Sequence, residues 1–328
     1  MTVTVKDVAR AAGVSASTVS RVANGDCRIS ARTTEKVLKC MKELDYHINN
    51  IGRSLKTNRT LTVGFVSPEL SNDVFMGIAK GAEDEFRKHG YNIIICNSNE
   101  SVEEEKERIS LLSQKCVDGI IIIPASAEGE HYKRISESGL PVVLVDRLVE
   151  HFETDAVLVD NINGSYSAIE YLINNGHRRI GFIGGDMRLT SAGERYEGYR
   201  RVLSDYCIPL EESIVKFGDY HIQSGYRIMS ELMEAMEPPD YVFVSNYYMN
   251  IGAMKYLLKQ KNEEMKKVSI AAFDDLEFSA ILGLCSVRVA QPMLDIGCRA
   301  AQLLLSRING ENMAFPQIIR LKTMLKIN

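Results

Sequence analysis

The chain has 328 residues, of which 45% are hydrophobic and 25% charged, and its formal net charge is −4. This length and composition predict a soluble globular protein of two or three domains with a large buried core. The seven cysteines are odd in number and no pair has the spacing of metal ligands. We therefore expect reduced thiols, a cytoplasmic protein and no metal site. No apolar run approaches the roughly 20 residues of a membrane span, and no apolar signal segment opens the chain.

The charge is divided unevenly along the chain. Residues 1–59 carry 11 Lys and Arg against 5 Asp and Glu, a net charge of +6, whereas residues 60–328 carry 28 against 38, a net charge of −10. A basic segment on an acidic body is expected when one end of a protein meets a polyanion and the other does not. Chance clustering of charges is the alternative explanation.

Three short helices are predicted near the N-terminus. Thr4 and Asp7 have the spacing of a capping box, so a first helix follows Thr4 and ends at Gly13. Ser15 is placed to cap a second helix, and a third helix begins near Ser30. The apolar positions that follow helical spacing and predict a shared core are Val5, Val8, Ala9, Ala12, Val14, Val19, Val22, Val37, Met41 and Leu44.

Only Gly13–Ser15 separates the first two of these helices. Two short helices joined by such a turn are typical of a helix-turn-helix, whose second helix lies in the DNA major groove. Ala16 and Ser17 would face outward and allow close approach to the bases, and Arg21 could donate two hydrogen bonds to a guanine. The hydroxyl side chains better placed for phosphates are Ser15, Thr18 and Ser20. An ordinary helical corner in a small bundle is the alternative.

The segment TVKDVARAAGVSASTVSRVANG, followed by ISARTTEKVLKCMKELDYHINNIGRSLKTNRT, resembles the headpiece of the LacI/GalR family of bacterial repressors. The resemblance implies that Ala16, Ser17 and Arg21 read bases. It also implies that Arg28, Ser30 and Thr33 lie near the DNA backbone. The full set of expected DNA contacts is Thr4, Ser15, Ala16, Ser17, Thr18, Ser20, Arg21, Asn24, Arg28, Ser30, Thr33, Arg53 and Leu55.

The same resemblance makes Asn49–Lys56 a hinge helix that orders when two subunits meet on DNA. Leu55 matches a leucine that enters the minor groove and bends the duplex, and Arg53 flanks it. A core leucine in a linker is the alternative for Leu55. Two positions depart from the family pattern, which usually has Pro at Ile48 and Ala at Gly52. Because Gly inside a helix costs about 1 kcal/mol relative to Ala, we expect this hinge to fold less readily.

From residue 60 onward, strand-like apolar runs alternate with helix-length segments. LTVGFVS, YNIIICN, DGIIIIP and PVVLVD are followed later by RRIGFIGG, DYVFVSN and VSIAAFDD. This rhythm predicts buried parallel strands covered by helices on both sides. The segment is too long for one small sheet and fits two similar lobes with a ligand in the cleft between them. The expected fold is therefore α/β, with a helix-turn-helix headpiece and a two-lobed, periplasmic-binding-protein-like effector domain.

The family resemblance also predicts where the domains divide. The expected boundaries are a headpiece at 1–46, a hinge helix and linker at 47–59, and an effector-binding and dimerisation domain at 60–328, with a lobe near DNA at 60–160 and 290–320 and a distal lobe at 161–289.

Polar side chains follow the apolar runs, at the strand ends where open α/β sheets bind ligands. Carboxylates and amides there suit the vicinal hydroxyls of a sugar. The resemblance matches Arg195 and Asp275 to effector-binding positions, and it pairs Asn246 with Tyr247 where the family has Asp. The expected effector site is Phe75, Asp146, Arg147, Arg195, Asn246, Asp275 and Gln291. Such strand-end residues often cap the following helix instead. Asp160 and Asp274 are as much expected to be caps or lobe-hinge residues as ligands.

The sequence thus predicts a homodimeric repressor that binds a palindromic operator in double-stranded DNA and responds to a sugar or sugar phosphate. Corepression by a phosphocarrier protein, as in one branch of the family, or a non-sugar ligand stays open as an alternative. An enzyme is disfavoured: GFIGGD lacks the dinucleotide-binding spacing, and His177 fits a structural role better than catalysis. We expect no catalytic residues and no cofactor. The basic N-terminal segment argues against a membrane-linked solute-binding protein.

Overall fold

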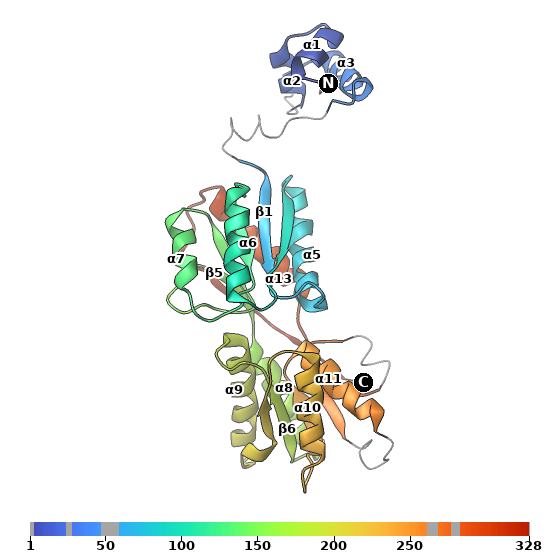
Figure 1. The fold of residues 1–328 in the computed structure, drawn as a ribbon, viewed down its shortest axis with the longest axis vertical. Coiled ribbons are helices and arrows are strands. Elements are labelled where there is room, and N and C mark those ends of the chain that lie inside the picture. The colour runs from blue at the N-terminus through green and yellow to red at the C-terminus, as the bar shows by residue number, and fades with distance from the viewer. Residues whose placement is uncertain (1–2, 24–27, 47–58, 261–267, 277–282, 328) are drawn as a thin grey trace. The chain divides into compact units, whose positions relative to one another are not determined.

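The structure is a computed structural model (Figure 1) that describes residues 3–23, 28–46, 59–260, 268–276 and 283–327, with the side chain of Ser136 left out. The chain folds into two compact units, Met1–Thr60 and Leu61–Asn328. The second unit contains two parallel-sheet lobes.

The first unit contains three described helices, α1 (Val5–Ala12), α2 (Ala16–Ala23) and α3 (Ala31–Glu43). Their boundaries follow from the local signals that the sequence predicts. Thr4 and Asp7 form a capping box, and Gly13 ends α1 in the left-handed region with φ of 60°. The Ser15 side chain accepts a hydrogen bond from the backbone N–H of Thr18 at 3.1 Å. Ser30 caps α3, and the predicted helix starts are confirmed.

The three helices share a small apolar core. Its buried members are Val8, Ala9, Ala12, Val19, Val22, Val37 and Met41. Ser17 is exposed as expected, but Ala16 is half-buried and packs against this core. The expectation that Ala16 faces fully outward is therefore wrong, because its methyl group at the start of α2 meets the apolar face that the helices bury together.

The first lobe is built on a six-stranded sheet in the order β11-β5-β4-β3-β1-β2. All of its strand pairs are parallel. Helices α5 and α13 pack on one face and α6 and α7 on the other. The elements are β1 (Thr62–Ser67), α5 (Asp73–Lys88), β2 (Asn92–Asn97), α6 (Val102–Gln114), β3 (Ile120–Ile122), α7 (Glu130–Glu137), β4 (Val142–Val145), β5 (Asp155–Val159), α13 (Met293–Ile308) and β11 (Ile318–Leu321).

The second lobe has a sheet in the order β12-β10-β9-β8-β6-β7, in which only the pair of β10 with β12 is antiparallel among the described strands. Helix α8 packs against α9, and α10 packs against α11. The elements are α8 (Asn161–Asn174), β6 (Ile180–Gly184), α9 (Thr190–Asp205), a 3₁₀ turn (Glu212–Ile214), β7 (Val215–Phe217), α10 (Ile222–Met233), β8 (Tyr241–Val244), α11 (Tyr247–Lys259), β9 (Ser269–Phe273), β10 (Cys285–Ala290) and β12 (Met324–Ile327).

The chain crosses between the two sheets three times, after β5, between β10 and α13, and between β11 and β12. Helix α13, reached by the second crossing, lies close against α5 (Figure 1). A Cβ at Gly297 of α13 would overlap the carbonyl oxygen of Ile78 of α5, so this close approach requires glycine. Late residues of the chain therefore complete the first lobe.

The strands that the apolar runs predict are buried, with the exception of β2. Strands β3, β4 and β5 are buried along their whole length, whereas Ile94 and Ile95 of β2 are 37% and 40% exposed. Strand β2 stands at the edge of its sheet and has one neighbouring strand. The expectation of a fully buried strand is therefore wrong there.

None of the described helices is long and apolar enough to span a bilayer.

Candidate DNA-binding face and effector cleft

The start of α2 carries a connected set of hydroxyl groups. Ser15 Oγ lies 2.7 Å from Ser17 Oγ and 2.8 Å from Thr18 Oγ1. Ser15 and Ser17 are exposed, and Arg21 is exposed one turn further along. A hydroxyl both donates and accepts, so these groups can exchange partners with base edges or phosphates. This arrangement suits the predicted role of α2.

Other expected DNA contacts lie at helix starts or on the surface of the headpiece. The Thr4 hydroxyl donates to the Asp7 carboxylate at 2.6 Å, and Ser30 Oγ lies 2.9 Å from Thr33 Oγ1. Ser30 stands at the N-terminus of the 13-residue α3, a position that favours phosphate. Ser20 and Arg28 are also exposed, whereas Thr33 is half-buried.

The predicted hinge is not covered by the structure. Asn24, Arg53 and Leu55, together with the departures at Ile48 and Gly52, lie outside the described residues. The hinge helix and the leucine wedge therefore stay predictions from the sequence.

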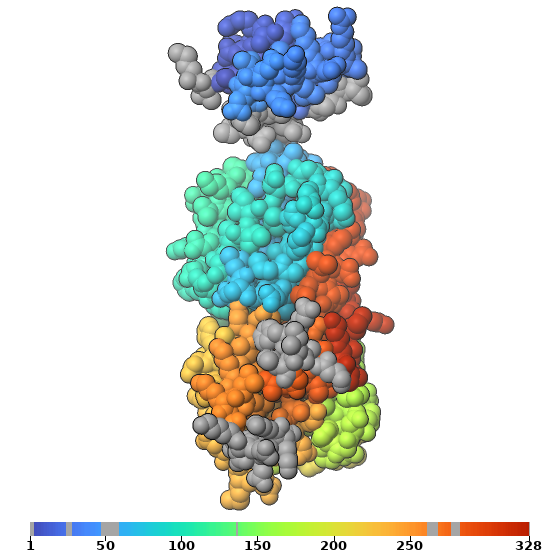
Figure 2. All heavy atoms as spheres, turned by 90° about the vertical axis from the view of Figure 1, so that its right-hand side faces the viewer, coloured from blue at the N-terminus to red at the C-terminus, as the bar shows by residue number. Residues whose placement is uncertain are grey.

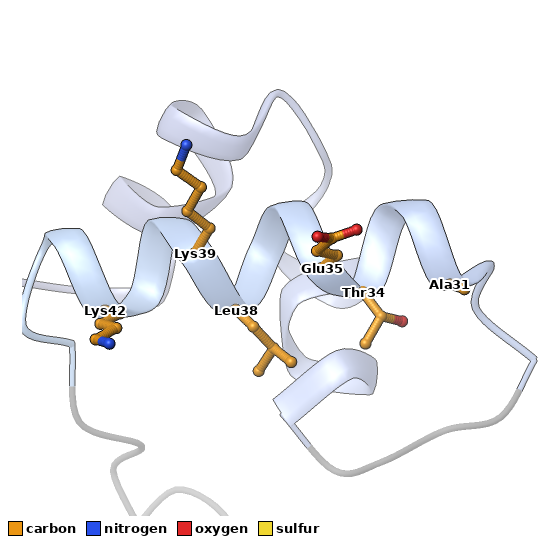
Figure 3. Close-up of a pocket in the computed structure, with 6 residues that line it drawn as sticks. All are labelled: Ala31, Thr34, Glu35, Leu38, Lys39 and Lys42. Carbon is orange, nitrogen blue, oxygen red and sulfur yellow. The ribbon is translucent and has the colours of Figure 1, made fainter.

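A hollow of about 630 Å³ lies along the outer face of α3 (Figure 3). Leu38 in this hollow is 52% exposed, and Lys39 Nζ lies 3.9 Å from Glu43 Oε1. All of its lining comes from one helix, so it is an open depression, and none of the expected DNA contacts lines it. The lining residues are Ala31, Thr34, Glu35, Leu38, Lys39 and Lys42.

A second, enclosed cavity lies between the two lobes, at the carboxyl ends of strands from both sheets. It contains six of the seven expected effector residues, namely Phe75, Asp146, Arg147, Arg195, Asn246 and Gln291. It also contains Asp274, which the sequence leaves open as a ligand, a cap or a lobe-hinge residue. Four further lining residues were not expected as ligands, namely Asn72, Val74, Ser191 and Tyr220. Asn72 caps α5 and Ser191 lies in the first turn of α9, and both helices follow strands, which is a signal that the sequence offers. Tyr220 follows the short strand β7 and has no comparable signal.

Asp146 and Asp274 are matched positions in the two lobes. Asp146 follows β4 with φ of 67°, and Asp274 follows β9 with φ of 83°. Both are buried. Backbone strain of this kind in a non-glycine residue clusters at ligand sites, and aspartate tolerates it better than most residues. Burial raises the pKa of Asp274, whose carboxylate accepts a hydrogen bond from Gln291 Nε2 at 2.6 Å.

Arg195 is buried and already has partners in the second lobe. Its Nε donates to Asn161 Oδ1 at 2.9 Å and its Nη1 to the carbonyl oxygen of Ser245 at 2.8 Å. Its guanidinium carbon lies 3.9 Å from the ring centroid of Phe273. The Nη2 lies 3.7 Å from Asp146 Oδ1 in the first lobe. Arg195 therefore reaches across the cavity while its orientation is fixed from behind.

Arg147 is held in the first lobe by a forked ion pair. Its Nη1 and Nη2 donate to the two Glu100 oxygens at 2.9 and 3.0 Å, and Nη1 also donates to the Pro124 carbonyl oxygen at 2.7 Å. Burial opposes the charge, but Glu100 outweighs it and holds the pKa of Arg147 above its usual value. The buried Nε has no hydrogen-bond partner among the described residues. It lies 3.5 Å from Asp146 Oδ2, an ion-pair distance, and could turn from that carboxylate to a ligand.

The structure does not bring Asp275 into the cavity. Its carboxylate accepts from Arg288 Nε at 2.7 Å and from Lys326 Nζ at 2.6 Å. Adjacent residues at a strand end point to opposite sides, so Asp274 enters the cavity and Asp275 joins an ion-pair cluster beside β12. Tyr247 also lies outside the lining, and its hydroxyl donates to Asp73 Oδ2 at 2.7 Å.

Each of the two units of the chain matches a known protein family model. The sequence model described as bacterial regulatory proteins, lacI family, matches residues 4–49. The model described as periplasmic binding proteins and sugar binding domain of LacI family matches residues 60–323.

Individual proteins match along almost the whole chain. The HTH-type transcriptional regulator RegA of Clostridium saccharobutylicum is 34% identical over 97% of this chain and 96% of its own length. Catabolite control protein A of Priestia megaterium is 33% identical over 95% of this chain and 94% of its own. A solved structure, the transcriptional regulator CelR–cellobiose complex, is 30% identical with a TM-score of 0.74 and covers 99% of this chain and 98% of its own.

A three-helix headpiece joined to a two-lobed body with a polar cavity between the lobes defines a ligand-responsive, DNA-binding regulator of transcription. The chain belongs to the LacI family of bacterial regulatory proteins. The matched relatives named above are regulators of transcription and not enzymes.

Proposed function

We propose that this regulator is a sequence-specific repressor that binds a palindromic operator as a homodimer and is controlled by a carbohydrate-type effector between its lobes. The observation that carries the proposal is the cavity, in which Asp146 and Arg147 of one lobe face Arg195 and Asp274 of the other. Such a constellation in a LacI-family chain gives the effector polar partners on both lobes, and any ligand that contacts both can bias their angle.

The headpiece is proposed to read DNA through α2. Ala16, Ser17 and Arg21 would contact base edges, and the net charge of +6 over residues 1–59 would make binding strongly salt-dependent. The proposed phosphate contacts are Thr4, Ser15, Thr18, Ser20, Arg28, Ser30 and Thr33. Asn24, Arg53 and the minor-groove wedge Leu55 complete the proposed DNA contacts, with the last two in a hinge within residues 47–59.

A hydroxyl-rich ligand fits the chemistry of the cavity. The carboxylates of Asp146 and Asp274 would accept hydrogen bonds from vicinal hydroxyls, and Arg147 Nε, which has no hydrogen-bond partner among the described residues, would donate one. Phe75 lines the cavity and would stack on the apolar face of a sugar ring. The cellobiose complex of the similar regulator supports this class of ligand. We propose Asp274 as the ligand in place of the expected Asp275, because Asp275 is paired elsewhere.

The proposed control depends on a difference between the effector's affinities for two arrangements of the lobes. An effector that binds one lobe arrangement better than the other shifts the balance between them, and the hinge helices of two subunits then pair more or less readily on the operator. The coupling works in either direction, so the same device serves an induced or a corepressed regulator.

The test begins with an operator selected from random palindromic DNA. Fluorescence anisotropy then follows binding of the full-length protein while sugars, sugar phosphates, nucleobases and a phosphocarrier protein are added in turn. Release or tightening by a carbohydrate supports the proposal and gives its sign. A response to the phosphocarrier protein or to a nucleobase alone would replace the effector assignment. No sequence-selective binding at all would overturn the repressor assignment.

A further inference from the structure

Two helix N-termini from different lobes meet at the rim of the cavity. Helix α5 begins at Asp73 after the cap Asn72, whose side chain accepts from the backbone N–H of Val74 at 3.0 Å. Helix α11 begins at Tyr247 after the cap Asn246, whose side chain accepts from the backbone N–H of Met249 at 3.1 Å. The two first residues touch, so their contact joins one lobe directly to the other.

The contact is a pair of hydrogen bonds donated by adjacent tyrosines. The Tyr247 hydroxyl donates to Asp73 Oδ2 at 2.7 Å, and the Tyr248 hydroxyl donates to Ser71 Oγ at 3.2 Å. The two tyrosine rings pack edge to face, with centroids 5.1 Å apart and an interplanar angle of 85°. We call these four residues the tyrosine clasp.

The environment of the clasp favours the donating form of each tyrosine. Burial raises the pKa of both hydroxyls, and the Asp73 carboxylate raises that of Tyr247 further. Asp73 itself lies in the first turn of α5, where the helix dipole favours a negative charge. Tyr247 is 5% exposed whereas Asp73 is exposed, so the bond is buried on the tyrosine side and open to water on the carboxylate side. An ionised aspartate at position 247 would be too short to reach Asp73 and would have no hydrogen to donate.

The opposite rim of the cavity is also closed. Thr190 Oγ1, at the start of α9, accepts from the backbone N–H of Leu148 and donates to its carbonyl oxygen, both at 3.3 Å. The lobes therefore meet on both sides of the cavity. Figure 2 shows the spheres of the first lobe lying directly against those of the second on the face in view.

The enclosed volume is too small for the proposed ligand. The cavity measures about 20 Å³. A single water needs roughly 10–15 Å³ on this measure, whereas ligand pockets have about 300–1,000 Å³. A sugar therefore enters only when the lobes move apart, and such a movement breaks the bond between Tyr247 and Asp73.

We propose that the tyrosine clasp holds the two lobes closed around a cavity too small for an effector, so that an effector has to open the clasp in order to bind. The clasp rests on the geometry alone, and its regulatory consequence rests on the proposed function. Loosening the clasp raises the fraction of open lobes and tightens effector binding by the same factor while that fraction is small. It also moves operator affinity in the direction in which the effector moves it.

Amide hydrogen exchange of the full-length protein, without DNA or ligand, tests the clasp directly. Tyr247→Phe removes the hydroxyl and keeps the ring. We expect exchange to rise about fivefold to tenfold, as for one partly buried hydrogen bond to a carboxylate. The rise should appear in cleft peptides from both lobes, namely those covering residues 71–76, 146–149, 190–195 and 246–250.

Two comparisons make the result specific. Tyr166→Phe removes a similar bond, from a tyrosine hydroxyl to Asp205 at 3.0 Å, but within the second lobe, and should leave the cleft peptides unchanged. Asp73→Ala should reproduce the effect of Tyr247→Phe from the other lobe. The double variant should then rise no further than either single variant, because both remove one interaction.

Unchanged exchange in Tyr247→Phe would overturn the clasp, as would an equal rise in Tyr166→Phe or full additivity in the double variant. This outcome is separate from that of the proposed function. Exchange in the free protein requires neither an operator nor an effector, so a failure to bind DNA or carbohydrate leaves the clasp result intact.

Discussion

Arg195 of the second lobe lies across the cavity from Asp146 of the first, with 3.7 Å between Nη2 and Oδ1. Both side chains are about 7% exposed, so their charges act on each other through the protein interior. The guanidinium is also tied to Asn161 and to Ser245 within its own lobe. Any ligand that inserts between the two charges replaces a contact that joins the lobes, which is why this pair is central to the proposed response.

Arg195→Ala should abolish the effector response and spare operator binding. It removes a cavity donor, one of the two arginines that flank the buried Asp146, and the hydrogen bonds to Asn161 and Ser245. We therefore expect the free energy of unfolding to fall by about 3 kcal/mol. Thermal unfolding and operator anisotropy measure the two effects. Arg188→Ala is the matched control, because that arginine is 83% exposed and pairs with Asp186 on the surface. An effector response that survives in Arg195→Ala would place the effector elsewhere.

Asp274→Asn should weaken the effector response, whereas Asp275→Asn should lower the free energy of unfolding. Burial raises the pKa of Asp274, so its charge opposes folding at neutral pH, and its removal should keep or increase stability while weakening the effector response. For Asp275, burial is outweighed by Lys326 and Arg288, which lower the pKa. Its loss should cost about 1 kcal/mol at neutral pH.

The contribution of Asp275 to the free energy of unfolding should depend on pH. A lowered pKa means that Asp275 stabilises the fold above its unfolded value near 3.8 and loses that effect as the pH falls through its folded value. The stability difference between wild type and Asp275→Asn should therefore begin to shrink near pH 3.8 and vanish only below the lowered pKa of the folded state. Chemical denaturation between pH 3 and pH 7 measures it. An Asp275→Asn variant that loses the effector response with unchanged stability would reverse the assignment of the two residues.

Arg21→Ala should relax discrimination at one guanine of the operator and cost roughly 1–3 kcal/mol on the selected sequence. The measurement compares affinity for the operator with affinity for random DNA at the same salt concentration. Lys39→Ala removes the same charge from the outer face of α3 (Figure 3) and should weaken both affinities slightly and equally. An equal loss on both DNAs in Arg21→Ala would argue for a phosphate contact.

Leu55→Ala should leave the fold intact and reduce the bending of bound DNA, because a wedge between base steps is lost. Bending is read from the mobility of complexes on circularly permuted operator fragments. Leu38→Ala is the control, since Leu38 is an exposed leucine of the same headpiece. Unchanged bending in Leu55→Ala would remove the wedge assignment.

Local signals made the headpiece predictable. Thr4 with Asp7, and Ser30 with Thr33, act over three residues, so the sequence contains everything that their capping geometry needs. Ala16 was misjudged because its burial depends on how the helices pack together, which capping signals do not report.

The cavity was predictable in outline for a different reason. Carboxyl ends of parallel strands gather at one edge of a sheet, so polar residues after apolar runs converge whatever the strand order. The choice between Asp274 and Asp275 depends on the residue at which β9 ends, and a one-residue difference reverses the direction of the side chain. The exposure of β2 depends on its edge position, which only the strand order reveals. Tyr220 enters the cavity from a loop with no periodic pattern.

The central claim is that the cavity and the operator are thermodynamically coupled. The most direct measurement is the affinity of the most responsive carbohydrate for the free protein and for the operator-bound protein. Linkage predicts that the ratio of these two affinities equals the ratio by which that carbohydrate changes operator affinity, within a range of about 5-fold to 150-fold. Equal carbohydrate affinities in the two states would contradict the account.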